Sequence, residues 1–92
     1  MIVRILGEGQ YELPDSDAER LNELDNKAVA EVEAGNESAF RDLWNQMLAL
    51  VESDGTKLDD GELVASGVIM PPRDISFAEA QAEFTGDGLI PD

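Results

Sequence analysis

Apolar and polar residues alternate at the start of the chain, over residues 2–6 and 10–13. This period of two is typical of strands with one buried face. If residues 7–9 form a three-residue loop, Arg4 lies opposite Glu12 on one face of the resulting hairpin. The other face then carries only apolar or aromatic side chains, namely Val3, Ile5, Tyr11 and Leu13. A phosphate-binding glycine loop would instead need a helix directly after its glycines, so the sequence predicts a β-hairpin.

Two longer segments have the apolar period of amphipathic helices. The first is predicted to begin after Ser16, in a capping box, and to run to about Ala34, with Gly35 ending it. The second is predicted over about residues 37–53, with Asn36 as its N-cap. A short linker joins them, so they should form an antiparallel helical hairpin. Their apolar faces comprise Leu21, Leu24, Ala28, Val29 and Val32 in the first helix, and Phe40, Leu43, Trp44, Met47, Leu48 and Val51 in the second.

One acidic residue, Asp25, falls on the apolar face of the first predicted helix. In one interpretation Asp25 lies at the edge of the apolar stripe and its carboxylate reaches water. In the other the carboxylate is buried and paired with an arginine, because lone carboxylates are rarely buried without a partner. The candidate partners are Arg20, Arg41 and Arg73.

The second half of the chain predicts a third strand and a third helix. Residues 68–70 are the best strand candidate, with a shorter strand suggested at 63–64, and two prolines end the stretch. Either Asp74 or Ser76 is predicted to cap a short helix to Phe84, and residues 76–79 fit a capping box. The expected fold is α+β, in one domain over residues 1–92. A small antiparallel sheet, made of the N-terminal hairpin plus a later strand, packs on the antiparallel helical hairpin, and a short C-terminal helix closes the core.

Four residues are predicted as partner contacts because a solvated acidic face does not account for them. They are Arg73, in a Pro-Pro-Arg-Asp loop, and Leu89, Ile90 and Pro91 near the end of the chain. An apolar pair such as Leu89-Ile90 is expected to dock, either on its own domain or on a partner.

The charge of the chain narrows the classes of partner. Twenty-one Asp and Glu residues against six Lys and Arg residues give a formal net charge of −15 at pH 7. Nucleic acids and anionic lipid surfaces select basic patches, so neither is an expected partner, whereas a basic protein surface is favoured. No apolar run approaches the ~20 residues that span a bilayer, so we expect no direct membrane insertion and a cytoplasmic location.

The residue types that the chain lacks exclude several kinds of catalysis and metal binding. The chain has no cysteine and no histidine, which excludes thiol catalysis and thiolate metal sites and removes the commonest general base. Neighbouring carboxylates such as Asp59, Asp60 and Glu62 could exchange protons, but a chain with this many acids brings such neighbours together by chance. We therefore predict no catalytic, cofactor-binding or metal-ligating residues, and a protein that is not an enzyme.

Three stretches together resemble the family of PspA-associated proteins (PspAA). They are MIVRILGEGQYEL, LNELDNKAVAEVEAGNESAF and VIMPPRDISFAEAQAEFTGDGLIPD, and the resemblance covers essentially all 92 residues. It implies an accessory or regulatory protein that associates with a PspA-type partner, a long helical protein of the phage-shock response to envelope stress. It implies no catalytic residues, and recruitment to the membrane through that partner.

Two other functions remain open at this point. The acidic chain could mimic nucleic acid and occupy a basic DNA-binding surface, which competition against DNA would reveal. It could also be a small-molecule sensing domain, because a sequence does not display pockets. Homo-oligomerisation is likewise left open.

Overall fold

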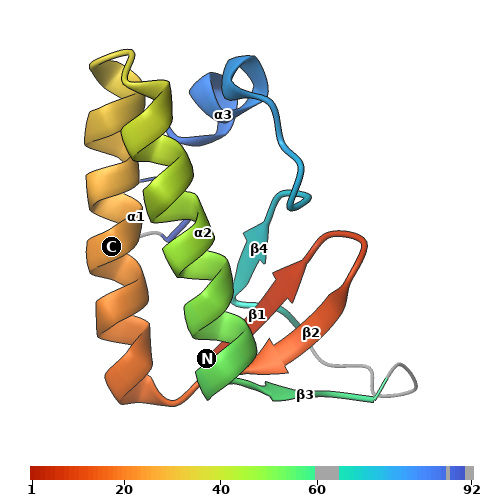
Figure 1. Cartoon of the computed structure of the whole chain (residues 1–92). Helices are drawn as coiled ribbons and strands as arrows, with labels where there is room; N and C mark the ends of the chain where they lie inside the picture. The colour runs from red at the N-terminus through yellow and green to blue at the C-terminus, as the bar shows by residue number, and fades with distance from the viewer. Residues whose placement is uncertain (60–64, 87, 91–92) are drawn as a thin grey trace.

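A computed structural model describes residues 1–59, 65–86 and 88–90 of the chain. Figure 1 shows two long helices side by side, a small sheet beside their lower half and a short helix at their upper end. In chain order the elements are β1 (Ile2–Ile5), β2 (Gly9–Glu12), α1 (Asp15–Glu33), α2 (Glu37–Asp54), β3 (Thr56–Lys57), β4 (Val68–Met70) and α3 (Phe77–Glu83).

The sheet is mixed, with the strand order β3-β2-β1-β4. β1 pairs antiparallel with β2, and β2 pairs antiparallel with β3, but β1 and β4 run parallel. The predicted α+β class is confirmed, whereas the antiparallel pairing expected for the later strand is wrong. β4 follows a long crossover through α1 and α2, and such a crossover lets a strand re-enter the sheet in the same direction as β1. No signal in the sequence predicted β3, which has only two residues, and the strand suggested at 63–64 is outside the described residues.

The N-terminal hairpin is confirmed, with a register two residues away from the predicted one. Arg4 faces Gln10 instead of Glu12. The backbone N–H of Glu8 donates to the carbonyl of Ile5 at 2.9 Å, which closes the turn earlier than expected. Because strand side chains alternate with a period of two, a slip of two residues leaves the same side chains on the buried face.

The helix boundaries agree with the sequence except at the start of α1. The N-cap of α1 is Pro14, with no side-chain cap hydrogen bond, so the capping box predicted at Ser16 is wrong. The carbonyl of Pro14 accepts the first hydrogen bonds of the helix, which therefore begins before the serine. The other predicted ends are confirmed: Gly35 takes a φ of 73° after α1, Asn36 caps α2 and Ser76 forms the capping box of α3.

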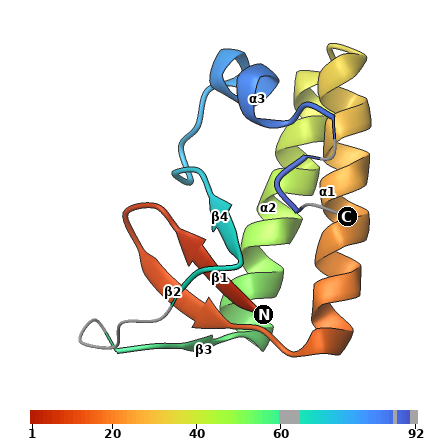
Figure 2. The ribbon, with the colours of Figure 1, turned by 180° about the vertical axis from the view of Figure 1, so that it is seen from behind.

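The core lies between the helical hairpin and the sheet and continues towards α3. Three of its fully buried side chains are aromatic, Phe40, Trp44 and Phe84. The Phe84 ring meets Phe40 and Trp44 edge-on, with centroids 5.1 and 5.8 Å apart. These contacts fix α3 against α2, because edge-on aromatic pairs add about 0.5–1.5 kcal/mol to the burial of their surface. From α3 the chain turns back, and Figure 2 shows its last described residues beside α1.

Candidate functional site

Arg73, which the sequence suggested as a partner contact, joins three parts of the fold. Its guanidinium donates two hydrogen bonds to the carboxylate of Glu8, at 2.8 and 3.1 Å, and forms an ion pair with Glu52 of α2. Its backbone carbonyl accepts a hydrogen bond from the indole N–H of Trp44 at 3.1 Å. Arg73 therefore ties the β1–β2 turn and α2 to the connection before α3, while 48% of its side chain stays exposed.

The C-terminal residues are held by Asp25, whose side chain is completely buried. The backbone N–H of Leu89 donates to both carboxylate oxygens at 3.0 Å, and that of Ile90 donates to Oδ2 at 2.9 Å. Hydrogen bonds to an ionised acceptor are stronger than those to a neutral one. The interpretation in which Asp25 reaches water is therefore wrong. The carboxylate is buried, and its partners include the backbone amides of Leu89 and Ile90, a kind of partner that the sequence interpretation did not consider.

Gly88 completes this arrangement by leaving room for the carboxylate. A Cβ atom on Gly88 would lie 2.7 Å from each carboxylate oxygen of Asp25, and the φ of Gly88 is 77°. Both features oppose a side chain at this position. Ile90 is buried in the core and Leu89 packs against the core while partly exposed. The apolar pair thus docks on its own domain, the first of the two placements considered for it.

The predicted partner contacts belong to different parts of the fold. Arg73 lies against the β1–β2 turn and α2, whereas Leu89 and Ile90 are fixed to α1. Pro91 is outside the described residues. Arg73 and Leu89 are accessible at the surface in this conformation, whereas Ile90 is only 7% exposed, so any contact of Ile90 with a partner would require it to leave the core.

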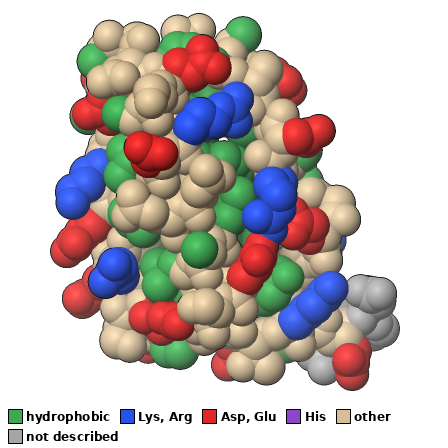
Figure 3. Space-filling model, in the orientation of Figure 1, with side chains coloured by type: hydrophobic (Ala, Val, Ile, Leu, Met, Phe, Trp, Pro, Cys, Tyr) green, Lys and Arg blue, Asp and Glu red, His purple; other side chains and the backbone are tan. Residues whose placement is uncertain are grey.

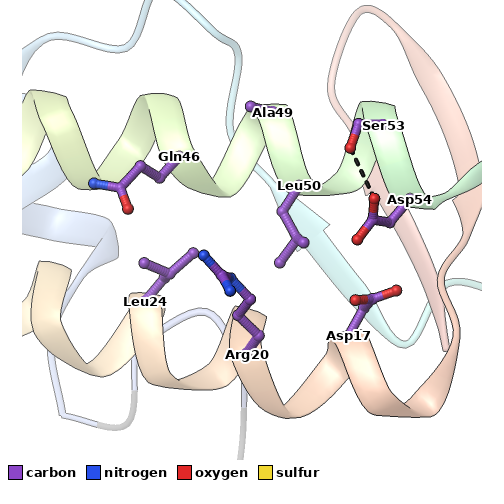
Figure 4. Close-up of a pocket in the computed structure, with 8 residues that line it drawn as sticks. All are labelled: Asp17, Arg20, Leu24, Gln46, Ala49, Leu50, Ser53 and Asp54. Atoms are coloured by element: carbon purple, nitrogen blue, oxygen red, sulfur yellow. Dashed lines mark hydrogen bonds between the residues drawn. The ribbon is translucent and has the colours of Figure 1, made fainter.

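A cleft between α1 and α2, here called the α1–α2 cleft, forms a concave surface on the part of the chain that the structure describes. Its volume is about 420 Å³ and it is open to solvent. Figure 4 shows Leu24 and Leu50 between the two helices, with the carboxylates of Asp17 and Asp54 facing each other at one end. The lining residues are Asp17, Arg20, Leu24, Gln46, Ala49, Leu50, Ser53 and Asp54.

At this end of the cleft two carboxylates, those of Asp17 and Asp54, lie close enough for their negative charges to repel. Partial loss of water around the carboxyl raises the pKa of Asp17 above its ordinary value of 3.8. A hydrogen bond to Asp54 and the charge of Asp54 raise this pKa further, while Arg20 acts in the opposite direction. The hydroxyl of Ser53 donates to Asp54 at 2.8 Å. The last turn of α2 has no basic residue, so the negative end of the helix dipole adds to the negative potential around Asp54.

Replacing Asp54 with asparagine should raise the free energy of unfolding at neutral pH. The pKa of Asp17 is higher in the folded than in the unfolded chain, so the folded chain binds more protons just above pH 3.8. The contribution of the Asp17 carboxyl to the free energy of unfolding therefore falls as the pH rises above 3.8, and it stays reduced at neutral pH. Asp54→Asn removes part of this effect, so its benefit should be largest near neutrality and disappear in acid. Urea unfolding across the acid range measures this.

Asp59→Asn is the matched control, since it removes the same charge from an exposed position outside α2. An equal gain in both variants at neutral pH would show that general charge, and not the Asp17–Asp54 contact, limits stability.

The sequence interpretation missed this cleft, although a signal for it was present. Asp17, Arg20 and Leu24 are spaced by three and four residues, and so share one face of α1. Leu50, three residues after Met47, lies at the edge of the apolar stripe of α2. A large apolar residue beside the core stripe indicates a second contact surface, but the sequence alone does not say which helix face it meets.

Two other features were searched for over residues 1–59, 65–86 and 88–90. This part of the chain holds no group of three or more acidic side chains placed to bind a metal ion. None of its helices is both long and apolar enough to cross a membrane. Asp60 and Glu62, two of the carboxylates considered for acid–base chemistry, are outside the described residues.

The fold and the cleft define a small α+β protein in which two antiparallel helices present an open groove. The chain belongs to the family of PspA-Associated proteins (PspAA), whose family model matches residues 1–92, the whole chain. The resemblance seen in the sequence is thereby confirmed. Searches of curated proteins and of solved structures found no match.

Proposed function

We propose that this protein is a non-enzymatic accessory protein that binds a PspA-type protein and regulates its action in envelope stress. The observation that carries the proposal is the match of the whole chain to a family defined as PspA-associated.

The charge of the chain supports a protein partner. A net charge of −15 favours basic protein surfaces and opposes direct contact with anionic lipids. We therefore place the protein in the cytoplasm and at the membrane only through its partner. Arg73 and Leu89 remain candidate contacts because both have exposed surface.

The small-molecule sensing alternative has one observation in its favour, the α1–α2 cleft. Its volume of about 420 Å³ falls within the range of small-molecule sites, roughly 300–1,000 Å³. Such sites usually enclose most of the ligand surface, whereas this cleft is open along the helices. An open groove between two helices suits a protein segment better. For the nucleic-acid mimic, the acidic charge remains the sole support.

The proposal is tested by mixing the purified protein with the full-length PspA-type protein of the same organism. Size exclusion with light scattering, at low and at high salt, would detect a defined complex. We expect co-elution that weakens as salt rises, because screening reduces charge-steered association. Separate elution at both salt concentrations, with both proteins folded, would contradict the proposed function.

A further inference from the structure

We propose that the α1–α2 cleft is the surface on which an amphipathic helix of the PspA-type partner docks. In this arrangement an apolar side chain of the partner covers Leu50, a lysine or arginine lies beside Asp17 and Asp54, and an aspartate or glutamate lies beside Arg20. The inference rests on the proposed function and adds to it the site and the chemistry of recognition.

The shape of the cleft fits a helix. α1 and α2 lie side by side (Figure 1), and the cleft between them is lined by residues 17–24 of α1 and 46–54 of α2. A third helix can seat its apolar stripe in such a groove. Leu50 packs against the core but remains partly exposed, and Ala49 beside it is small and exposed. These two residues provide a shallow apolar floor.

The order of charges along the cleft specifies the occupant. Asp17 and Arg20 are three residues apart on α1, a rise of about 4.5 Å. Figure 4 shows the Arg20 side chain reaching towards Leu24, away from the end where Asp17 and Asp54 meet. A helix whose basic and acidic residues are one turn apart would match both groups at once. The cleft is therefore selective for a bipolar helix rather than for any basic surface.

A cation is particularly favoured at the Asp54 end. Asp54 lies in the last turn of α2, where the helix dipole is negative and no basic residue of that turn compensates it. Asp17 faces the same point from α1. A partner's lysine or arginine here would relieve the repulsion between the two carboxylates as well as forming new ion pairs. Binding would thus remove an unfavourable interaction that the free protein retains.

On the surrounding surface, the arrangement of individual charges, more than the net negative charge, would orient the partner helix. Figure 3 shows acidic and basic side chains interspersed with apolar ones over the face that presents α1 and α2. A partner attracted only by net negative charge would gain little orientation on such a face. Alternating charges set the register of a docked helix, because like charges meet when the register is wrong.

The test compares the affinity of the full-length PspA-type protein for the wild type and for three full-length variants. Asp54→Lys reverses a cleft charge, and Ala49→Trp fills the groove without changing any charge. Glu33→Lys makes the same charge change as the first variant at an exposed residue of α1 outside the cleft. Calorimetry at fixed, moderate salt gives Kd, and circular dichroism with urea unfolding verifies the fold. Asp54→Lys should remain folded because it removes the repulsion with Asp17.

We expect Kd to rise at least about tenfold for Asp54→Lys and Ala49→Trp, and less than about threefold for Glu33→Lys. Wild-type binding with equal Kd values for all variants would overturn the cleft as the docking site and leave the proposed function standing. Loss of binding that tracks net charge alone, in both lysine variants and not in Ala49→Trp, would also overturn it. No binding by the wild type would overturn the proposed function together with this inference. If the cleft variants instead change self-association of the chain, the occupant is a second copy and the inference is wrong.

Discussion

Asp25→Asn is expected to lower the free energy of unfolding by about 2–4 kcal/mol, because hydrogen bonds to a buried charged group contribute about 1.5–3 kcal/mol. The asparagine keeps one acceptor oxygen and places an NH₂ group against a backbone N–H. Oδ2 accepts from both Leu89 and Ile90, so an amide oxygen in its place keeps both hydrogen bonds but without the negative charge that strengthens them. Urea unfolding measures the loss, and amide hydrogen exchange at Leu89 and Ile90 should accelerate more than at residues in the middle of α2.

Glu23→Gln is the matched control, since it removes one charge from an exposed position two residues away on α1. It should change the free energy of unfolding by less than about 0.5 kcal/mol, as surface substitutions usually do. A similar small change for Asp25→Asn, with unchanged exchange at Leu89 and Ile90, would show that the carboxylate does not hold the C-terminal segment.

Trp44→Ala is the second substitution with a large expected effect, a loss of about 3–5 kcal/mol of unfolding free energy. A chain of this length has a total stability of roughly 5–14 kcal/mol, so the variant should unfold at a much lower urea concentration than the wild type. The cause is the position of the side chain, which is fully buried between Phe40 and Phe84 and donates to the carbonyl of Arg73. Its removal leaves a cavity and an unpaired carbonyl at the junction of α2 and α3.

Trp44→Phe separates these two causes, since it keeps an aromatic ring and removes the indole N–H. We expect it to lose about 1–3 kcal/mol, mainly from the hydrogen bond and a smaller cavity. Circular dichroism and urea unfolding of both variants provide the comparison. Near-wild-type stability for Trp44→Ala would mean that α3 and the connection before it do not depend on this contact.

The sequence determined which side chains are buried along each regular element. Val3, Ile5 and Tyr11 face the core as the alternating pattern predicted, even though the hairpin register is two residues away. Their burial survives because a slip of two preserves the faces of a strand. The helical stripes were equally clear, since their period depends only on local geometry, and the N-caps at Asn36 and Ser76 are similarly local signals.

The tertiary structure decided what lies opposite each of these faces. The parallel pairing of β4 with β1 depends on the path of the chain across the helical hairpin, which no local pattern records. The pairing of Asp25 with amides more than sixty residues away is similar: the sequence marked an acid on an apolar face and offered only charged side chains as partners. Backbone amides leave no residue-type signature, so such a partner is invisible in composition.

The candidate site also has features that the sequence showed and features that only helix packing decided. The sequence specified the family, the acidic charge and the residues of each helix, and from these came the expectation of a protein partner. The α1–α2 cleft itself exists only because α1 and α2 pack at a particular rotation, which brings Asp17 to face Asp54 and leaves Leu50 partly uncovered. Periodicity assigns a residue to a face of its own helix, but packing between helices decides whether that face is core or groove.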